Sequence, residues 1–213
     1  MFTGIIESIG TIESVSPLQD SAWAGVRLQV HAPTLDFSDV KLGDSIAIQG
    51  ACMTVIRMED ARFWVDVSQE SLSKTVGLHQ PGEVNLEKAM RLSDRVGGHL
   101  VSGHVDGLGN VVDFSPVGES WHLQIRSPQT LSPFFAYKGS VTVNGVSLTV
   151  NKVDDLPSGE CDIHINLIPH TVQMTTLKHL QAGSPVNLEI DQIARYCERI
   201  VKTINLAPSN PER

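Results

Sequence analysis

The amino-acid sequence contains the same pattern twice, and this duplication restricts the chain to folds built from two similar units. Blocks 42–44, 46–55, 65–72 and 81–87 recur in the same order as blocks 137–139, 141–150, 165–172 and 182–189. Gly4 and Gly103 stand at equivalent places near the start of the two units. Because ordered matches at a nearly constant offset rarely arise by chance, we infer two copies of one domain. The pair Gly97-Gly98 permits a sharp joint between them.

Short alternating segments predict an all-β fold. Apolar and polar residues alternate, as in half-buried strands, over residues 26–30, 45–49, 63–68, 84–87, 123–125, 140–144 and 162–167. Turn residues separate these segments. About six short strands in each half predict two tandem six-stranded antiparallel barrels, which close and so leave no exposed edge. Short helical turns are expected at the equivalent residues 32–37 and 128–135.

A heptad pattern follows the second barrel. Its apolar positions are Ile190, Ile193, Cys197, Ile200 and Ile204. This pattern predicts an amphipathic helix, and isoleucine at both seam positions favours association of three or more helices. The alternative is a helix that packs on its own barrel, which its length of about two and a half heptads favours. We therefore expect domains at 1–97 and 98–189, a helix at 190–205, and a disordered tail at 206–213.

Composition excludes several functional classes. The chain of 213 residues is 41% hydrophobic, carries a formal charge of −8 and has no basic stripe, which argues against a nucleic-acid partner. It contains no apolar run of membrane-spanning length and no visible secretory signal, so we expect a cytoplasmic protein that does not bind membranes. The three cysteines are odd in number and lack metal-site spacing, which indicates reduced thiols.

The stretch 99–106 contains two histidines and an aspartate, a combination that first suggests a metal site. On an extended strand, however, His99 and His104 would lie on opposite faces, and only His104 and Asp106 would share one. No second cluster supplies further ligands, so we predict no metal. His104 is a candidate hydrogen-bond partner or proton carrier near neutral pH. The alternative is a histidine at a barrel rim that forms hydrogen bonds but has no role in function.

Equivalent positions of the two repeats carry Cys52-x-Thr54 and Ser147-x-Thr149. Residues two apart on a strand share a face, so these pairs are candidates for two copies of one ligand pocket. The alternative is a small buried residue followed by an ordinary strand former. Residues 66–71 and 166–171, read as a strand end plus a turn, can offer backbone groups to a flat heterocycle. The absence of a phosphate-binding glycine loop from the sequence argues against a nucleotide cofactor.

Residues 1–7, 97–107, 143–150 and 167–171 resemble the riboflavin synthase family, and the resemblance extends from residue 1 to about residue 204. It implies Greek-key barrels, a homotrimer with the C-terminal helix packed among three subunits, and a reaction without metal or redox cofactor. Two 6,7-dimethyl-8-ribityllumazine molecules would exchange a four-carbon unit, giving riboflavin and 5-amino-6-(D-ribitylamino)uracil in the last step of riboflavin biosynthesis. The site would lie between the N-terminal barrel of one subunit and the C-terminal barrel of its neighbour. Lumazine synthase is a candidate partner.

The resemblance also implies site residues. The catalytic neighbourhood would contain Phe2, Cys52, His104, Ser147 and Thr149. We expect His104 to carry the proton, and Cys52, Ser147 or water held by them to be the transient nucleophile. The first pocket would contain Gly4, Ile5, Ile6, Cys52, Met53, Thr54, Asp66, Val67, Ser68, Gln69, Glu70 and Ser71. The second would contain Gly103, His104, Val105, Lys138, Ser147, Leu148, Thr149, Asn166, Leu167, Ile168, Pro169, His170 and Thr171.

Two positions depart from the family pattern: His170 stands where glutamate is usual, and Ser71 where threonine is usual. Both retain hydrogen-bonding groups. The alternative function is a non-catalytic lumazine- or flavin-binding protein on the same duplicated barrel, as in light-emitting bacteria. Such relatives tend to lose residues of the second pocket, whereas the chain here retains Phe2, Cys52, His104, Ser147 and Thr149. A structural or interaction barrel without a ligand is a third alternative, but it would not need two matched polar pockets.

Overall fold

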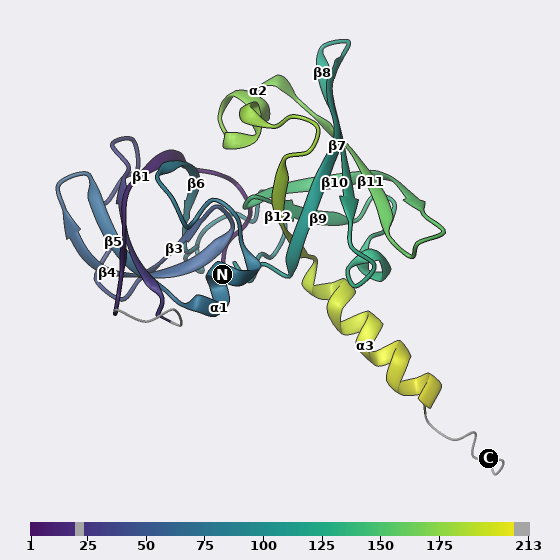
Figure 1. The fold of residues 1–213 in the computed structure, drawn as a ribbon, viewed down its shortest axis with the longest axis horizontal. Coiled ribbons are helices and arrows are strands. Elements are labelled where there is room, and N and C mark those ends of the chain that lie inside the picture. Colours follow the sequence, from purple (N-terminus) through teal and green to yellow (C-terminus); the bar gives the residue numbers. More distant parts are fainter. Residues whose placement is uncertain (20–23, 207–213) are drawn as a thin grey trace.

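The chain forms two closed six-stranded antiparallel barrels followed by a C-terminal helix (Figure 1). The structure is a computed structural model that describes residues 1–19 and 24–206. The first barrel consists of β1 (Ser8–Pro17), β2 (Val26–His31), β3 (Ser45–Ile48), β4 (Ala51–Glu59), β5 (Arg62–Val67) and β6 (Gly82–Lys88), with α1 (Gln69–Lys74) between β5 and β6. The predicted all-β fold is confirmed.

The second barrel repeats the first. It consists of β7 (Gly107–Val117), β8 (Ser120–Ser127), β9 (Ser140–Val143), β10 (Val146–Asp155), β11 (Cys161–Leu167) and β12 (Pro185–Ile190). The short helices η1 (Ser132–Phe134), α2 (Pro169–Gln173) and η2 (Thr176–His179) connect these strands. The order around the first barrel is β1-β2-β5-β4-β3-β6, and the same circular order holds for the equivalent strands of the second. The duplication seen in the sequence is therefore a duplication of topology.

Each barrel encloses its own apolar core. Leu28 and Val30 of β2 are fully buried, while Gln29 between them is half-buried, as the alternating pattern predicts. Full burial of such a side chain contributes about 1.5–3 kcal/mol to stability. β-bulges interrupt equivalent strands, between Ile12 and Ser14 in β1 and between Val111 and Asp113 in β7. Bulges bend strands, so these help the short sheets to close.

Buried polar side chains join the two barrels across a local twofold relation. Asn85 Nδ2 donates to the carbonyl oxygen of Asn144 at 2.8 Å, and Asn187 Nδ2 donates to the carbonyl oxygen of Gln49 at 2.9 Å. Both asparagines are only 1% exposed. Each therefore satisfies a backbone acceptor of the opposite barrel, and the two barrels are held in one fixed arrangement.

Two glycines bring the barrels into backbone contact on the same local axis. A Cβ atom added to Gly50 would lie 2.7 Å from the amide nitrogen of Gly145, and one added to Gly145 would lie 2.9 Å from the amide nitrogen of Gly50. Both glycines have positive φ. No larger residue fits at either position without moving the barrels apart.

Several local elements differ from expectation. Residues 66–71 and 166–171 end in the helices α1 and α2 rather than in simple turns. α1 starts because the Ser68 hydroxyl caps it, accepting from the amide of Ser71 at 3.1 Å, whereas α2 starts at Pro169. The turn expected at 128–135 contains η1, while residues 32–37 form no helix.

The C-terminal helix α3 (Gln192–Leu206) starts later than expected because Ile190 belongs to β12, where it pairs with Val141 of β9. α3 contacts η1 and then projects away from the second barrel (Figure 1). Its side chains Ile193, Tyr196 and Ile200 are exposed in the single chain. The alternative of a helix that packs on its own barrel thus holds only for one face of α3, where Ala194 and Val201 line a hollow with Phe134. Of the tail predicted to be disordered, residues 207–213 lie outside the described residues.

Candidate active site

The opening segments of the two repeats lie side by side between the barrels. The amide of Phe2 donates to the carbonyl oxygen of Val101 at 2.8 Å, and the amide of Val101 donates back to Phe2 at 3.0 Å. The Phe2 side chain is fully buried and packs with Ala47 and Val101. This antiparallel bridge fixes both segments where they cross from one unit to the other.

After the bridge, each opening segment continues onto the barrel of the other repeat. The amide of Cys52 donates to the carbonyl oxygen of Gly103, and the amide of Ser147 donates to that of Gly4, both at 2.8 Å. Gly103 therefore lies with Cys52, and Gly4 with Ser147. This corrects the grouping expected from the sequence, which assigned each opening segment to the pocket of its own repeat. Strand periodicity could not reveal the exchange, because the crossing segments are irregular.

Steric contacts make the exchange specific. A Cβ atom on Gly103 would lie 2.7 Å from the Cβ atom of Cys52, and one on Gly4 would lie 2.6 Å from that of Ser147. Gly103 and Gly4 also have φ values of +77° and +75°, which favour glycine. Two glycines thus permit the close approach of each segment to the opposite barrel.

The first pocket is a hollow of about 250 Å³ on the first barrel. Its lining residues are Ala51, Cys52, Met53, Glu70, Ser71, Lys74, Thr75, Gly103, His104 and Val105. It brings together the predicted residues Cys52 and His104, which come from different repeats. Lys74 and Thr75 were missed because the segment was read as a turn. A helical reading would have placed Lys74 one turn after Glu70, and the structure shows that ion pair at 2.9 Å.

The second candidate site is a polar cluster centred on Ser147 of β10. Ser147 and Thr149 share the outer face of the strand, as predicted, while Leu148 between them points into the core. His99 Nδ1 lies 2.7 Å from Ser147 Oγ, and His99 Nε2 lies 3.3 Å from Thr142 Oγ1. The prediction that His99 lies on a strand face is wrong, because residues 99–106 form no strand beyond the isolated bridge at Val101. His99 is therefore a candidate site residue that the sequence did not reveal.

The environment of His99 favours its neutral form. Burial lowers the pKa of the imidazole, against a smaller opposing effect of Asp191. In the tautomer with the proton on Nε2, Nδ1 accepts from the Ser147 hydroxyl and Nε2 donates to Thr142. The hydroxyl of Ser147 is thus hydrogen-bonded to a neutral base.

Other predicted binding residues occupy several kinds of position. Four have side chains in the barrel cores and can offer a ligand only their backbone atoms: Met53, Val67, Leu148 and Leu167. Asp66 is paired with Arg27 at 2.8 Å, and the Lys138 ammonium lies 3.2 Å from Asn151 Oδ1. Ile5, Thr54, Asn166, Ile168, Pro169 and His170 are exposed. Ile6 packs against the second core and Val105 against the first, which agrees with the exchange of segments.

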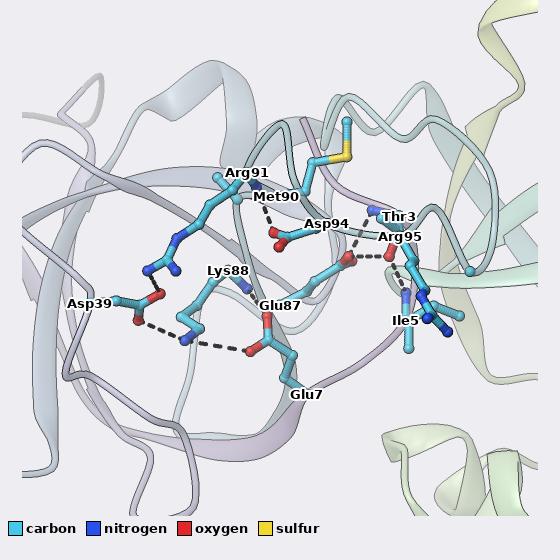
Figure 2. Close-up of a pocket in the computed structure, with 12 residues that line it drawn as sticks. Thr3, Ile5, Glu7, Asp39, Glu87, Lys88, Met90, Arg91, Asp94 and Arg95 are labelled. Atoms are coloured by element: carbon cyan, nitrogen blue, oxygen red, sulfur yellow. Dashed lines mark hydrogen bonds and ion pairs between the residues drawn. The ribbon is translucent and has the colours of Figure 1, made fainter.

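A separate hollow of about 420 Å³ lies beside β6, next to the opening segment of the chain (Figure 2). Its charged side chains largely satisfy one another: Lys88 Nζ lies 2.8 Å from Asp39 and 3.8 Å from Glu7, and Arg91 also pairs with Asp39. Among the predicted site residues, only Ile5 lines this hollow. We therefore place the candidate active site at the two matched sites around Cys52 and Ser147.

Comparisons with known proteins agree with this placement. The lumazine binding domain model matches residues 3–89 and again residues 102–191. The chain is 42% identical over 203 residues to riboflavin synthase of Photobacterium phosphoreum, covering 94% of this chain and 89% of that protein. It is 41% identical over 209 residues to riboflavin synthase of Brucella abortus, covering 95% and 98%.

Solved structures give the same fold. LumP complexed with riboflavin has a TM-score of 0.76 at 25% identity and covers 89% of this chain and 99% of LumP. LumP complexed with 6,7-dimethyl-8-(1'-D-ribityl) lumazine has a TM-score of 0.74 at 24% identity, covering 89% and 98%. Together, the domain match on both repeats and the nearly full-length relatives place this chain in the riboflavin synthase family.

Proposed function

We propose that this chain is a riboflavin synthase, a transferase that moves a four-carbon unit between two molecules of 6,7-dimethyl-8-ribityllumazine. The products would be riboflavin and 5-amino-6-(D-ribitylamino)uracil. The observation that carries this proposal is the presence of two matched polar sites in one chain. Each combines a polar strand residue, Cys52 or Ser147, with a glycine from the other repeat. A reaction between two copies of one substrate requires two such sites.

The chemistry requires orientation and proton transfer. One lumazine must lose a proton from its 7-methyl group, and the other must accept a nucleophile. Holding two reactants in register can supply about 7–11 kcal/mol of the barrier in favourable cases. We assign His104, which lines the first pocket, as the proton carrier. Of the candidate nucleophiles, Ser147 is better supported than Cys52, because its hydroxyl is hydrogen-bonded to the imidazole of His99.

We further propose that the protein is a homotrimer whose catalytic site forms between the N-terminal barrel of one subunit and the C-terminal barrel of its neighbour. The exposed apolar side chains of α3 support this assembly: Ile193, Tyr196, Ile200, Val201 and Ile204. Five exposed apolar side chains on one projecting helix are typical of a protein interface. A cytoplasmic location and association with lumazine synthase are parts of the same proposal.

None of the helices among the described residues combines the length and apolar character that a membrane crossing requires.

The alternative is a non-catalytic lumazine- or flavin-binding protein, which the fold of LumP supports. Two observations favour the enzyme. Identity to the riboflavin synthases is about 40% over nearly the whole chain, against 25% to LumP. In addition, Ser147 and Thr149 of the second pocket are both present.

The deciding experiment is incubation of the purified protein with 6,7-dimethyl-8-ribityllumazine alone, with riboflavin followed by absorbance and chromatography. Riboflavin formed at half the amount of lumazine consumed, without added cofactor, is the expected result. Lumazine binding without turnover would favour the binding protein. Absence of binding would contradict both functions.

A further inference from the structure

Each barrel ends in a buried glutamate that the proposed chemistry does not use. Glu87 of β6 and Glu189 of β12 occupy equivalent positions of the duplication and are only 4% and 2% exposed. Burying a carboxylate is costly unless hydrogen-bond donors surround it. The partners of these two residues therefore indicate why carboxylates are present there.

Glu189 accepts hydrogen bonds from three consecutive backbone amides. The donors are the amides of Ser102 at 2.6 Å, Gly103 at 3.0 Å and His104 at 3.0 Å. The left-handed conformation of Gly103 lets successive N–H groups converge on one anion. Since the donors belong to the segment that lines the first pocket, Glu189 of the second barrel holds a wall of the pocket on the first barrel.

Glu87 has the same relation to the other segment. It accepts from the amide of Thr3 at 2.7 Å, from the Thr3 hydroxyl at 2.7 Å and from the amide of Gly4 at 2.9 Å. Figure 2 shows Thr3 and Glu87 facing each other at the edge of the charged hollow. Gly4 in turn contacts Ser147 of the second barrel. The glutamate of each barrel therefore holds the segment that contacts the other barrel.

We propose that Glu189 and Glu87 are positioning residues: Glu189 holds Gly103 and His104 over Cys52, and Glu87 holds Gly4 against Ser147. Both oxygens of each carboxylate are used, so an amide of the same size cannot replace either one fully, because its NH₂ group would face N–H donors. The energetic cost of burial supports this role, since burial raises the pKa of Glu189 to about 7 and that of Glu87 above its usual value.

The first test uses Cys52 as a local reporter and does not depend on the proposed function. Full-length wild-type protein and the variants Glu189→Gln, Glu189→Asp, Glu87→Gln and Glu59→Gln are treated with iodoacetamide, and alkylation is located by peptide mass spectrometry. Cys197, which is exposed in the single chain and lies on the helix proposed to form the trimer, reports any change of assembly. Exposed Glu59 is the control for loss of a charge. Circular dichroism checks that each variant is folded.

We expect Glu189→Gln to accelerate alkylation of Cys52 by about tenfold, as loss of a charge-assisted hydrogen bond would allow, with Cys197 unchanged. Glu189→Asp keeps the charge but withdraws the carboxylate by one methylene. Faster alkylation of Cys52 in both variants would therefore show that the position of the carboxylate, and not its charge alone, holds the segment in place. If Glu189→Gln does not fold, Glu189→Asp carries the test. Equal Cys52 rates in the wild type and the Glu189 variants, or equal acceleration by Glu87→Gln, would overturn the proposal.

The second test rests on the proposed function and asks what each carboxylate does for catalysis. Wild-type protein that fails to bind lumazine would count against the proposed function, while the alkylation result would still judge the positioning role. In an active wild type, we expect Glu189→Gln and Glu87→Gln each to weaken one of two lumazine sites by about tenfold in a fluorescence titration, and to lower kcat. A lower kcat with unchanged lumazine affinity at both sites would contradict the positioning role of the two glutamates.

Discussion

The amide nitrogen of Cys52 lies 2.8 Å from the carbonyl oxygen of Gly103, although the two residues belong to different repeats. The contact joins the strand that carries a candidate nucleophile to the segment that carries the candidate proton carrier His104. Neither repeat contains a complete pocket by itself. Changes at this contact should therefore affect both barrels.

Gly103→Ala should destabilise the fold by about 2–4 kcal/mol, since the new methyl group meets Cys52 and Phe2 and the backbone is left-handed there. Urea unfolding measures the change. Gly43→Ala is the matched control: Gly43 has φ +92° but open space around it, so only the backbone strain of about 1 kcal/mol is expected. Equal losses in the two variants would show that the approach to Cys52 is not tight.

His99→Ala should lower kcat by about tenfold or more and change lumazine affinity much less, because Ser147 loses the neutral base that accepts its proton. Steady-state kinetics and ligand titration separate the two effects. His179→Ala provides the control, since His179 is exposed and pairs with Glu83 on the surface. An unchanged kcat in His99→Ala would remove His99 from the chemistry.

Glu189 should make the folded state less stable as the pH rises. Its folded pKa of about 7 lies above the usual value of 4.5, chiefly because of burial and also through the nearby charge of Asp106. Between these values the folded protein holds a proton that the unfolded chain has released. The contribution of Glu189 protonation to the free energy of unfolding is therefore fully present below pH about 4.5. It is lost as the pH rises through 7, by up to about 3 kcal/mol. Denaturant unfolding from pH 5 to 8 should show a weaker pH dependence in Glu189→Gln than in the wild type.

Asn187→Ala should cost about 2–4 kcal/mol, because the side chain joins Gln49 and both backbone groups of Val76 across the barrel interface. The loss leaves buried backbone groups unsatisfied, which is more costly than loss of a surface hydrogen bond. Thermal unfolding of this variant is compared with that of Asn110→Ala, whose side chain is exposed on β7. Similar melting temperatures for the two variants would contradict the role assigned to Asn187.

Ile200→Asp should weaken the proposed trimer by placing a charge in the apolar stripe of α3. Sedimentation velocity should show a shift toward a single chain, and turnover should fall with it. Lys202→Asp places an aspartate on the opposite face of the same helix, where Lys202 pairs with Glu198, and should leave the assembly intact. A trimer unaffected by both substitutions would mean that α3 is not the interface.

The sequence predicted those features that depend on local periodicity. The shared face of Ser147 and Thr149 follows from strand alternation, and the two barrels follow from the repeated blocks and the turns between them. α1 and α2 were missed because each is shorter than two helical turns and leaves no clear periodic signal.

The exchange of opening segments could not be predicted in this way. It depends on one isolated bridge between Phe2 and Val101 and on contacts of Gly4 and Gly103 with distant strands. His99 is not among the predicted site residues because an extended strand would place it on the opposite face from His104. Its position beside Ser147 is instead set by tertiary contacts. Non-local pairing of irregular backbone has no periodic signature in the chain.

The back-to-back contact of Gly50 and Gly145 has an evolutionary consequence. The local twofold relation gives this single chain the symmetry of a dimer of identical barrels. In a true dimer, one gene would encode both pockets, so every mutation would alter the two together. Fusion of the copies removes that coupling, and the residues now differ at matched positions, with Cys52 at one candidate site and Ser147 at the other. Under the proposed function, duplication allows two binding sites for identical molecules to specialise, as a reaction with unlike donor and acceptor roles requires.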